Sequence, residues 1–313
     1  MGNHSGHECL LRAYGDVGGN LDIFNDKKYA HLIVDGNKVC SSQDLDGLVM
    51  DAKETEDGVD IDFVLKAGYV IEKPVHLCFG VVPERGLQKI NVKGIVEDNS
   101  SIDLMAYCVF PNSIEVRHMM EAYFEVGEGG HFGYSETHFH GNNGAIVNPK
   151  AKIVLKRASH FKTLFSLLRG RVGNLNIEYD VEGEEKSTAD MTAKVYGSGE
   201  DKIRVSEASY LRGKDAKSLI KSRIFVKDKA ESIVESKIEA YEAGARGHVD
   251  CIETILNNAR ARAIPIVGVF HEKAKVTHEA SIGSVDKKQI ETLMAHGLSE
   301  EDSIKLIVSG MLR

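Results

Sequence analysis

The amino-acid sequence predicts a mainly β protein, a solenoid of short strands that ends in an α-helical segment. Three observations predict this fold class. Apolar and polar residues alternate over many short stretches, glycine-rich turns separate those stretches, and one turn pattern recurs along the chain.

Short strands are expected throughout residues 31–276. Strands with one buried face alternate apolar and polar residues, as happens at 59–63, 89–93, 174–179 and 221–226. Turn clusters separate them, for example at 126–130, 141–144, 183–185 and 197–201. With 30 glycines in 313 residues, the chain is expected to make many of its turns with glycine. A two-sheet sandwich rarely needs so many strands in series, whereas a coil of strands does.

A degenerate turn pattern favours the coil. In it, an apolar residue is followed by a polar turn, a small residue at the fifth place and a return to strand. Three segments follow this pattern and two more fit it loosely: Val147–Ile153, Phe270–Val276, Val226–Ser232, Leu155–Phe161 and Val126–Phe132. Solenoids produce recurring corners because each turn bends at the same place above its neighbour. Ordinary hairpin turns of an antiparallel fold remain the alternative.

Residues 277–313 are predicted to be helical, and residues 1–30 form an N-terminal segment that the sequence defines poorly. The first helix is marked by helical spacing before a glycine, at Ile290, Leu293, Met294 and Gly297. The second is expected to begin at Ser299, whose hydroxyl can accept a first-turn N–H. Its apolar stripe comprises Ile304, Ile307, Val308 and Met311. The stripe could dock onto the β body or bind a partner.

Charge and hydropathy exclude several classes of partner. The formal net charge of −8 argues against nucleic acid and anionic membranes. No apolar run approaches the roughly 18 residues of a membrane-spanning helix, and residues 1–30 lack the apolar core of a signal peptide. We therefore expect a cytoplasmic protein.

The sequence lacks the motifs of several enzyme classes. It has no phosphate-binding P-loop, no G-x-S-x-G nucleophile motif and no H-E-x-x-H zinc motif. Its cysteines are odd in number and far apart, which argues against disulfides and against a self-contained zinc site: Cys9, Cys40, Cys78, Cys108 and Cys251. Any bound metal must therefore use ligands from distant parts of the chain or from another subunit.

Two histidine-rich stretches contain residue types that bind metals. His4, His7 and Cys9 have ligand spacing, but they lie at a chain end, where flexibility is the rule. His138 and His140 would share one face of a strand, near His118 and His131, and we expect surface histidines there. Cys78 and Cys108 lie in apolar strands and are expected to be buried and inert.

A third constellation lies near the end of the β region. Strand alternation places Cys251 and Glu253 on one face, and His248 and Asp250 on the other. Further along, His278 and Glu279 are adjacent, so a strand would point one inward and the other outward. A thiolate assisted by imidazole or carboxylate suits iron–sulfur chemistry.

The chain from about Gly244 to Arg313 resembles the SufB/SufD family of iron–sulfur cluster assembly proteins. The resemblance is carried by Ala245–Cys251, Ala263–Pro265, Ala274–Gly283 and Leu293–Glu300. Two segments further upstream resemble the family's β core: Arg169–Gly173 and Lys221–Arg223. The resemblance implies a right-handed parallel β-helix that is capped by a helical segment.

The resemblance also implies a function. It points to a scaffold that assembles nascent iron–sulfur clusters and transfers them to apo-proteins. The scaffold would work as a homodimer with a SufC-like ABC ATPase docked on the helical segment. The cluster would be held transiently, and ATP hydrolysis would come from the partner, so the chain itself would not be an enzyme. The alternative is a SufD-like adaptor that dimerises and anchors the ATPase without holding a cluster. A polysaccharide-active β-helix enzyme is disfavoured, because the chain has no Trp.

The family's ligands can be carried over only by position. Cys251 would be the principal thiolate, and Glu279 or His278 would be the next ligand. Glu253 and His248 are further candidates. Counted back from Pro265 without a gap, the family's cysteine falls on Asp250, and a shift of one residue places it on Cys251. The presence of both Cys251 and Glu279 implies a compact SufB-like member.

Overall fold

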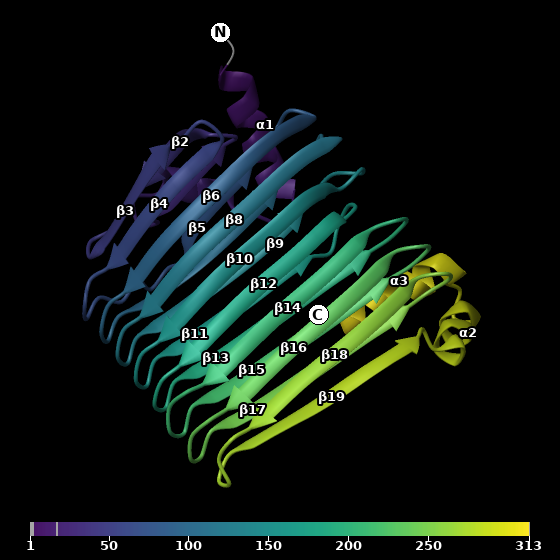
Figure 1. The fold of residues 1–313 in the computed structure, drawn as a ribbon. Helices are drawn as coiled ribbons and strands as arrows, with labels where there is room; N and C mark the ends of the chain where they lie inside the picture. The colour runs from purple at the N-terminus through teal and green to yellow at the C-terminus, as the bar shows by residue number, and fades with distance from the viewer. Residues whose placement is uncertain (1–2, 17, 313) are drawn as a thin grey trace.

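The computed structural model describes residues 3–16 and 18–312, and for residues 3–9 it describes the backbone alone. His4, His7 and Cys9, which have the spacing of metal ligands, therefore lie outside the described side chains. The chain winds into a solenoid of two facing sheets and ends in two helices (Figure 1). The predicted mainly β solenoid with C-terminal helices is confirmed.

Successive strands alternate between the two sheets over most of the chain. Sheet A contains β1 (His31–Asp35), β2 (Lys38–Gln43), β5 (Val75–Gly80), β7 (Ser101–Val109), β9 (His131–Phe139), β11 (His160–Leu167), β13 (Thr188–Gly197), β15 (Lys217–Val226), β17 (Arg246–Ile255) and β19 (Lys275–Ser284). Sheet B contains β3 (Leu48–Glu54), β4 (Gly58–Leu65), β6 (Arg85–Val96), β8 (Glu115–Val126), β10 (Ala145–Leu155), β12 (Gly173–Gly183), β14 (Lys202–Leu211), β16 (Glu231–Ala240) and β18 (Arg260–Val269).

Parallel pairing in register joins each turn of the solenoid to the next. Lys217 pairs with Arg246, and Arg246 pairs with Lys275, so equivalent residues lie 29 apart in the sequence, as 217, 246 and 275 do. Among the described strands, only the N-terminal hairpins β1–β2 and β3–β4 are antiparallel. The space between the sheets, here called the lumen, is filled mainly by inward-facing apolar side chains. Many of the large ones are aromatic, among them Phe79, Phe110, Phe124, Phe132, Phe161 and Phe165.

The corners of the solenoid repeat because one residue of each takes a left-handed backbone conformation. At one edge this residue is Asn99, Gly129, Ala158, Lys186, Asp215 and Gly244 in successive turns. At the other edge it is Gly141, Gly170, Gly199, Asp228 and Asn257. The corners are also hydrogen-bonded to one another, since the Gly129 N–H donates to the Arg157 carbonyl at 3.0 Å and the Ala158 N–H to the Glu185 carbonyl at 2.8 Å. Glycine adopts this conformation without strain, which explains part of its abundance.

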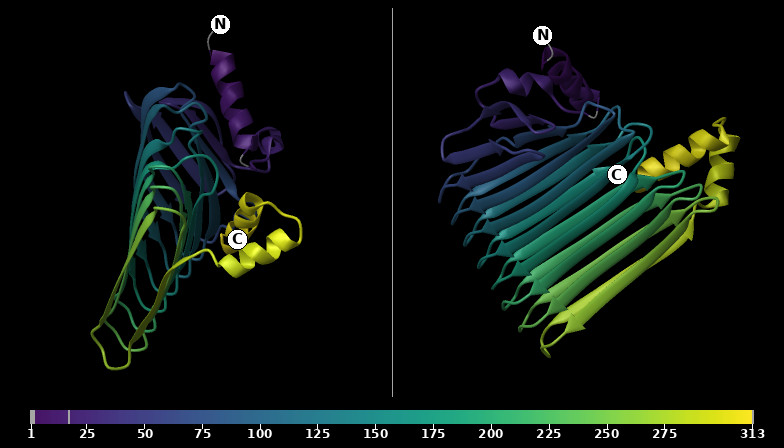
Figure 2. Two further views of the ribbon diagram at one scale, coloured as in Figure 1. Left: turned by 90° about the vertical axis from the view of Figure 1, so that its right-hand side faces the viewer. Right: turned by 45° about the horizontal axis from the view of Figure 1, so that its top comes forward.

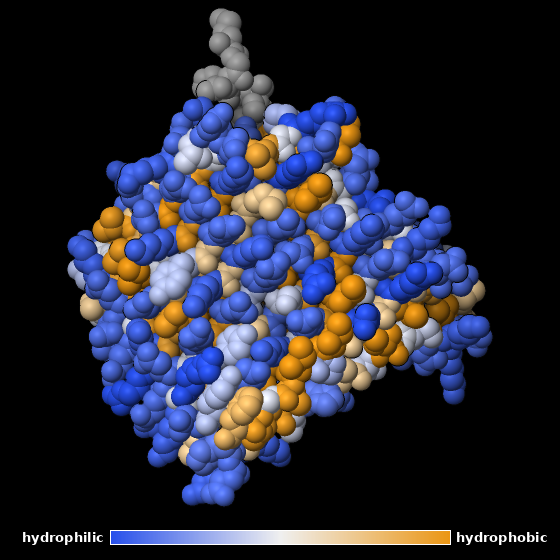
Figure 3. Space-filling model, in the orientation of Figure 1, coloured by the Kyte–Doolittle hydropathy of each residue, from blue (hydrophilic) through white to orange (hydrophobic). Residues whose placement is uncertain are grey.

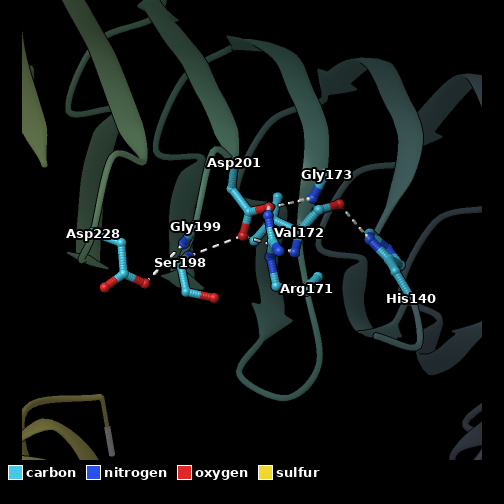
Figure 4. Close-up of polar contacts among 8 residues, drawn as sticks. All are labelled: His140, Arg171, Val172, Gly173, Ser198, Gly199, Asp201 and Asp228. Atoms are coloured by element: carbon cyan, nitrogen blue, oxygen red, sulfur yellow. Dashed lines mark hydrogen bonds and ion pairs between the residues drawn. The ribbon is translucent and has the colours of Figure 1, made fainter. Parts of the chain in front are cut away.

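A buried carboxylate holds the second edge together. Asp201 accepts hydrogen bonds from the Val172 N–H at 3.1 Å, the Gly173 N–H at 3.0 Å and the Ser198 N–H at 2.9 Å (Figure 4). The Arg171 guanidinium donates to the same carboxylate at 2.8 Å. Asp201 therefore ties two successive corners together.

One of the expected corners is not a corner. Val147–Ile153 lies within β10, whereas the other four pattern segments span turns. Its polar residues Asn148 and Lys150 point out of the sheet, and Lys150 pairs with Glu178 of the next turn at 3.0 Å. A strand whose outward-facing residues are polar can therefore show the same sequence pattern as a turn.

Helices cover parts of the outer face of sheet A at both ends (Figure 2). Near the N-terminus, α1 (Asn3–Asp16) packs Tyr14 against Tyr107, and it is followed by the short 3-10 helix η1 (Leu21–Asn25). Near the C-terminus, α2 (Lys287–Ala295) and α3 (Glu300–Met311) pack on Phe225. The Ser299 hydroxyl accepts the Asp302 N–H at 3.1 Å, as the capping pattern predicts.

Strand β19 continues to Ser284, so the solenoid extends beyond the expected boundary at residue 276. Among the described residues, no helix combines the length and apolarity that crossing a membrane requires.

The left-handed corners lead to a stability prediction. Ala158 has φ 57°, a conformation that costs an L-residue about 1–2 kcal/mol. Ala158→Gly should relieve that cost at the expense of some unfolded-state entropy, and so raise the free energy of unfolding by about 0.5–1 kcal/mol in urea titrations. Ala151→Gly, within strand β10, is the matched control and should lower it. Equal losses from both variants would contradict this account of the corners.

Candidate functional site

Strand β17 places the candidate thiol inside the solenoid. Cys251 is 2% exposed and Glu253 is fully buried, and both face the lumen. His248 and Asp250 alternate with them and lie on the outer face of sheet A. Cys251 and Asp250, the two positions that compete for the family's cysteine, therefore lie on opposite walls.

Strand β19 divides the next two candidates in the same way. Parallel register pairs Val249 with His278 and Asp250 with Glu279. Side chains that are paired in register share a face, so His278 lies on the lumen side and Glu279 on the outer side. Both are exposed, because β19 belongs to the last turn.

The candidates thus form two groups. Cys251, Glu253 and His278 lie on the lumen side of sheet A, and His248 and Glu279 lie on its outer side. Among the described residues, no three His, Cys, Asp or Glu side chains are grouped so that they could hold a metal ion. The described candidates of one chain therefore do not converge on a single point.

The Cys251 thiol is held in its protonated form. Burial raises its pKa to about 12, and the neighbouring Glu253 carboxyl adds to that shift. The thiolate, and not the thiol, is the metal ligand. Cys251 can therefore bind iron only if it loses a proton as the bond forms.

Other polar groups line the lumen near Cys251. The Ser232 hydroxyl donates to Glu253 Oε2, while Glu253 Oε1 has no hydrogen-bond partner, and burial raises the pKa of Glu253. Ser222 lies beside Cys251 in the register of β15 and β17, and its hydroxyl has no partner. Ser236 on β16 is likewise buried without a partner. In these last turns the lumen contains several unpartnered polar groups among its apolar side chains, whereas further back it is more aromatic.

Glu207 is a residue that the sequence reasoning missed. It is 2% exposed, its Oε2 has no partner, and burial raises its pKa to about 8. It also adds to the raised pKa of Cys251. Strand alternation could have placed it in the lumen. Ile203, Val205 and Leu211 occupy inward positions of β14, and Glu207 lies on the same face.

The outer group makes ordinary surface contacts. Arg223 Nη2 lies 2.5 Å from Asp250 Oδ2, and this ion pair lowers the pKa of Asp250. His248 Nδ1 is 2.8 Å from Thr277 Oγ1. These contacts fix the outer wall of sheet A beside Glu279.

The last turn leaves the solenoid open. One edge of β18 and one edge of β19 have no neighbouring strand in the part of the chain that the structure describes. Inward-facing residues of this turn are exposed as a result: Val267 at 41%, Val269 at 49% and Ile282 at 45%. Figure 3 shows an apolar band along β18 at this end. We call this surface the open end.

The expectation of surface histidines at His118, His138 and His140 is wrong. All three are buried in the lumen, where they pack against Phe110 and Phe165. The His140 ring donates to the Val172 carbonyl at 2.9 Å (Figure 4), and its other nitrogen lies 3.2 Å from His138 Nδ1. Burial lowers the pKa of His118 to about 3 and of His140 to about 4, so both are neutral. His118 and His138 occupy inward-facing strand positions and His140 directly follows β9, so all three are buried although they are polar.

A family model described as the SufBD core domain of the SUF system for FeS cluster assembly matches residues 86–311. An iron-sulfur cluster assembly SufBD family protein of Methanocaldococcus jannaschii is 38% identical over 286 residues, which cover 91% of this chain and 90% of the relative. One from Pyrococcus horikoshii is 29% identical over 306 residues, or 98% and 93% of the two chains. A second from that organism is 25% identical over 262 residues, or 79% and 56%.

The buried Glu207 predicts a pH dependence of stability. Its pKa in the fold is above the ordinary value of 4.5, so the unfolded chain loses this proton first. The fold therefore loses stability as pH rises from about 4.5 to about 8. Glu207→Gln should remove this loss and raise the free energy of unfolding at pH 8 by roughly 2–4 kcal/mol relative to wild type.

Urea titrations at pH 5 and pH 8 measure this difference. Glu235→Gln, on the outer wall of β16, is the matched control and should show no such pH-dependent gain. A Glu207→Gln variant that gains nothing at pH 8 would mean that the carboxyl is solvated.

Proposed function

The chain belongs to the SufBD family of iron–sulfur cluster assembly proteins, and we propose that it is the scaffold on which a nascent cluster is assembled and from which it is transferred to apo-proteins. The observation that carries the proposal is the position of Cys251, a lumen-facing thiol in the turn next to the open end. A thiolate is the ligand that iron–sulfur clusters prefer.

The donor set of one chain suits a cluster that is shared between two chains. Cys251 would be the principal thiolate, and His278 lies on the same wall one strand nearer the open end. Glu279 lies at the same edge on the outer wall, and Glu253 offers an unpartnered oxygen inside. Because these groups do not converge within one chain, the shell requires a second copy.

The open end supports dimerisation. Unpaired strand edges and exposed apolar side chains are surfaces that proteins normally cover. Two copies meeting through this end would form a two-fold interface, in which each copy contributes the same residues. The Cys251, His278 and Glu279 side chains of both copies would then lie around one site.

An ABC ATPase would supply the energy. The chain has no P-loop. Its α2–α3 pair exposes Met294 (44%) and Leu306 (51%) beside a groove lined by Asp286, Lys288, Gln289, Thr292, Leu293 and Ile307. Exposed apolar residues on a helix pair suit docking of a SufC-like partner. Movement of two docked ATPases would be transmitted to the dimer interface, because the helices are packed on sheet A.

A second candidate is a structural adaptor that anchors the ATPase and holds no cluster. The protonated, buried state of Cys251 favours it, since a thiol with a pKa of about 12 is a poor ligand until its surroundings change. Both candidates share the open end and the helical docking surface, and they differ in whether iron binds at Cys251.

Anaerobic reconstitution with ferrous iron and sulfide distinguishes the two. The scaffold should develop thiolate-to-iron absorption in the visible region, with and without the ATPase present, and Cys251→Ser should lose most of it. Cys40→Ser, which removes an exposed thiol, is the control and should retain it. If wild type binds no stoichiometric cluster, the adaptor is the better description. If Cys251→Ser binds as much as wild type, the ligand is another residue.

Dimerisation through the open end is tested by adding a buried charge there. Val269→Glu should convert the dimer to a monomer in sedimentation velocity, because two carboxylates would be desolvated at the interface. Val49→Glu, at a strand valine with the same exposure of 49%, is the matched control and should leave the dimer intact. Dissociation by both substitutions, or by neither, would place the interface elsewhere.

A further inference from the structure

The outer face of sheet A is positively charged in the C-terminal half of the solenoid. Six basic side chains point outward from β13, β15, β17 and β19: Lys194, Lys217, Lys221, Arg223, Arg246 and Lys275. The acidic side chains that point outward from the same strands are Asp190, Asp250 and Glu279. We call this surface the basic face. It is a local excess of positive charge on a chain with a formal net charge of −8.

Three of these cations are crowded together. Lys194 pairs in register with Arg223, and Lys221 lies two residues from Arg223 on the same wall. Burial lowers the pKa of Lys194, and the charges of Arg223 and Lys221 lower it further. Asp250 forms an ion pair with Arg223 and is the register partner of Lys221, whose charge also lowers the pKa of Asp250. One carboxylate therefore serves two of the three cations, and Lys194 has no ion pair with a described residue. Like charges on adjacent strands destabilise a sheet, and an anionic partner would offset that cost.

The basic face borders the proposed cluster site. Asp250 and Glu279 are register partners at its C-terminal margin, and Cys251 lies on the opposite wall of the same strand. Helices α2 and α3 pack on Tyr196 and Phe225, at the carboxyl ends of the strands. The amino ends of β15, β17 and β19, with Lys217, Arg246 and Lys275, are exposed.

We propose that the basic face is the docking surface for a small acidic protein that receives the iron–sulfur cluster. This inference rests on the proposed scaffold function and adds the chemistry of the acceptor. Opposite charge would orient the acceptor with its cluster-binding side toward the open end. It would also speed the encounter, because charge complementarity acts mainly on association rate.

The arrangement of charge favours a protein over other anions. Strands in a sheet lie about 4.8 Å apart, so four strands spread the basic face over roughly 15 Å, more than one phosphate covers. Asp190 and Asp250 interrupt the basic residues and would repel a continuous phosphate backbone. The helices project from the same side of the solenoid and would hold a flat membrane away from it (Figure 2).

Binding of an acidic apo-ferredoxin to the dimer tests the proposal. The test variant is the double substitution Lys194→Glu and Lys221→Glu. The matched control is Lys93→Glu and Lys202→Glu on the outer face of sheet B, which changes the net charge equally. At about 20 mM salt the dissociation constant for apo-ferredoxin should be at least about tenfold higher for the test variant than for wild type. The control variant should bind apo-ferredoxin as wild type does. The difference should disappear near about 0.5 M salt.

Further measurements separate acceptor binding from cluster assembly and from folding. Binding uses the apo-ferredoxin and a scaffold without cluster, so a failed reconstitution does not affect it. Cluster assembly on the test variant should equal that of wild type. If the Glu variant fails to fold, Lys194→Gln with Lys221→Gln takes its place and should show a smaller loss in the same direction. Equal binding by test and control variants overturns the proposal. So does a test variant that binds apo-ferredoxin normally but has lost affinity for the ATPase or for a polynucleotide.

Discussion

In-register parallel pairing between successive turns is the interaction on which the rest of the structure depends. It repeats over most of the chain, and because strand side chains alternate strictly, it assigns every residue of the solenoid to the lumen or to the outside. Ser222, Cys251 and Ala280 therefore lie one above another on the lumen side of sheet A. A shift of one residue in a single turn would exchange Cys251 for Asp250. The left-handed corners preserve the register by bending each turn at the same place.

The features of the last turns on which the proposed cluster site rests are the ones that cost stability. Glu207 and Glu253 are buried with unpartnered oxygens, and the last turn leaves strand edges unpaired. Buried polar groups without partners and an open end both lower the stability of a fold. Local conflicts of this kind are expected at functional sites. Turns nearer the N-terminus differ because their lumen is richer in aromatic side chains and its buried carboxyl, Glu136, accepts hydrogen bonds from the Tyr134 and Tyr179 hydroxyls. The buried His140 there is neutral and donates to the Val172 carbonyl.

Much of the fold could be predicted because its signals are local. Alternation marks the strands, and a serine cap with an apolar stripe marks α3. Two of the sequence patterns led to wrong predictions, because each is compatible with two different structures. The polar residues of Val147–Ile153 resemble a turn but form the outer wall of β10. His118 and His138 resemble surface residues but fill gaps among aromatic rings in the lumen. Glu207 was missed because a glutamate among apolar residues is expected to face water.

The sequence by itself determined the solenoid fold, the helical end, the family and the division of neighbouring residues between two walls. Those properties follow from residue type, from period-two alternation and from short motifs. Only the tertiary structure decided which wall is the lumen, that His278 lies on it and Glu279 does not, and that Glu207 acts electrostatically on Cys251. The physical reason is distance along the chain. These contacts join residues that are about one turn or more apart, and they depend on strand register and on packing across the lumen, which local patterns do not encode.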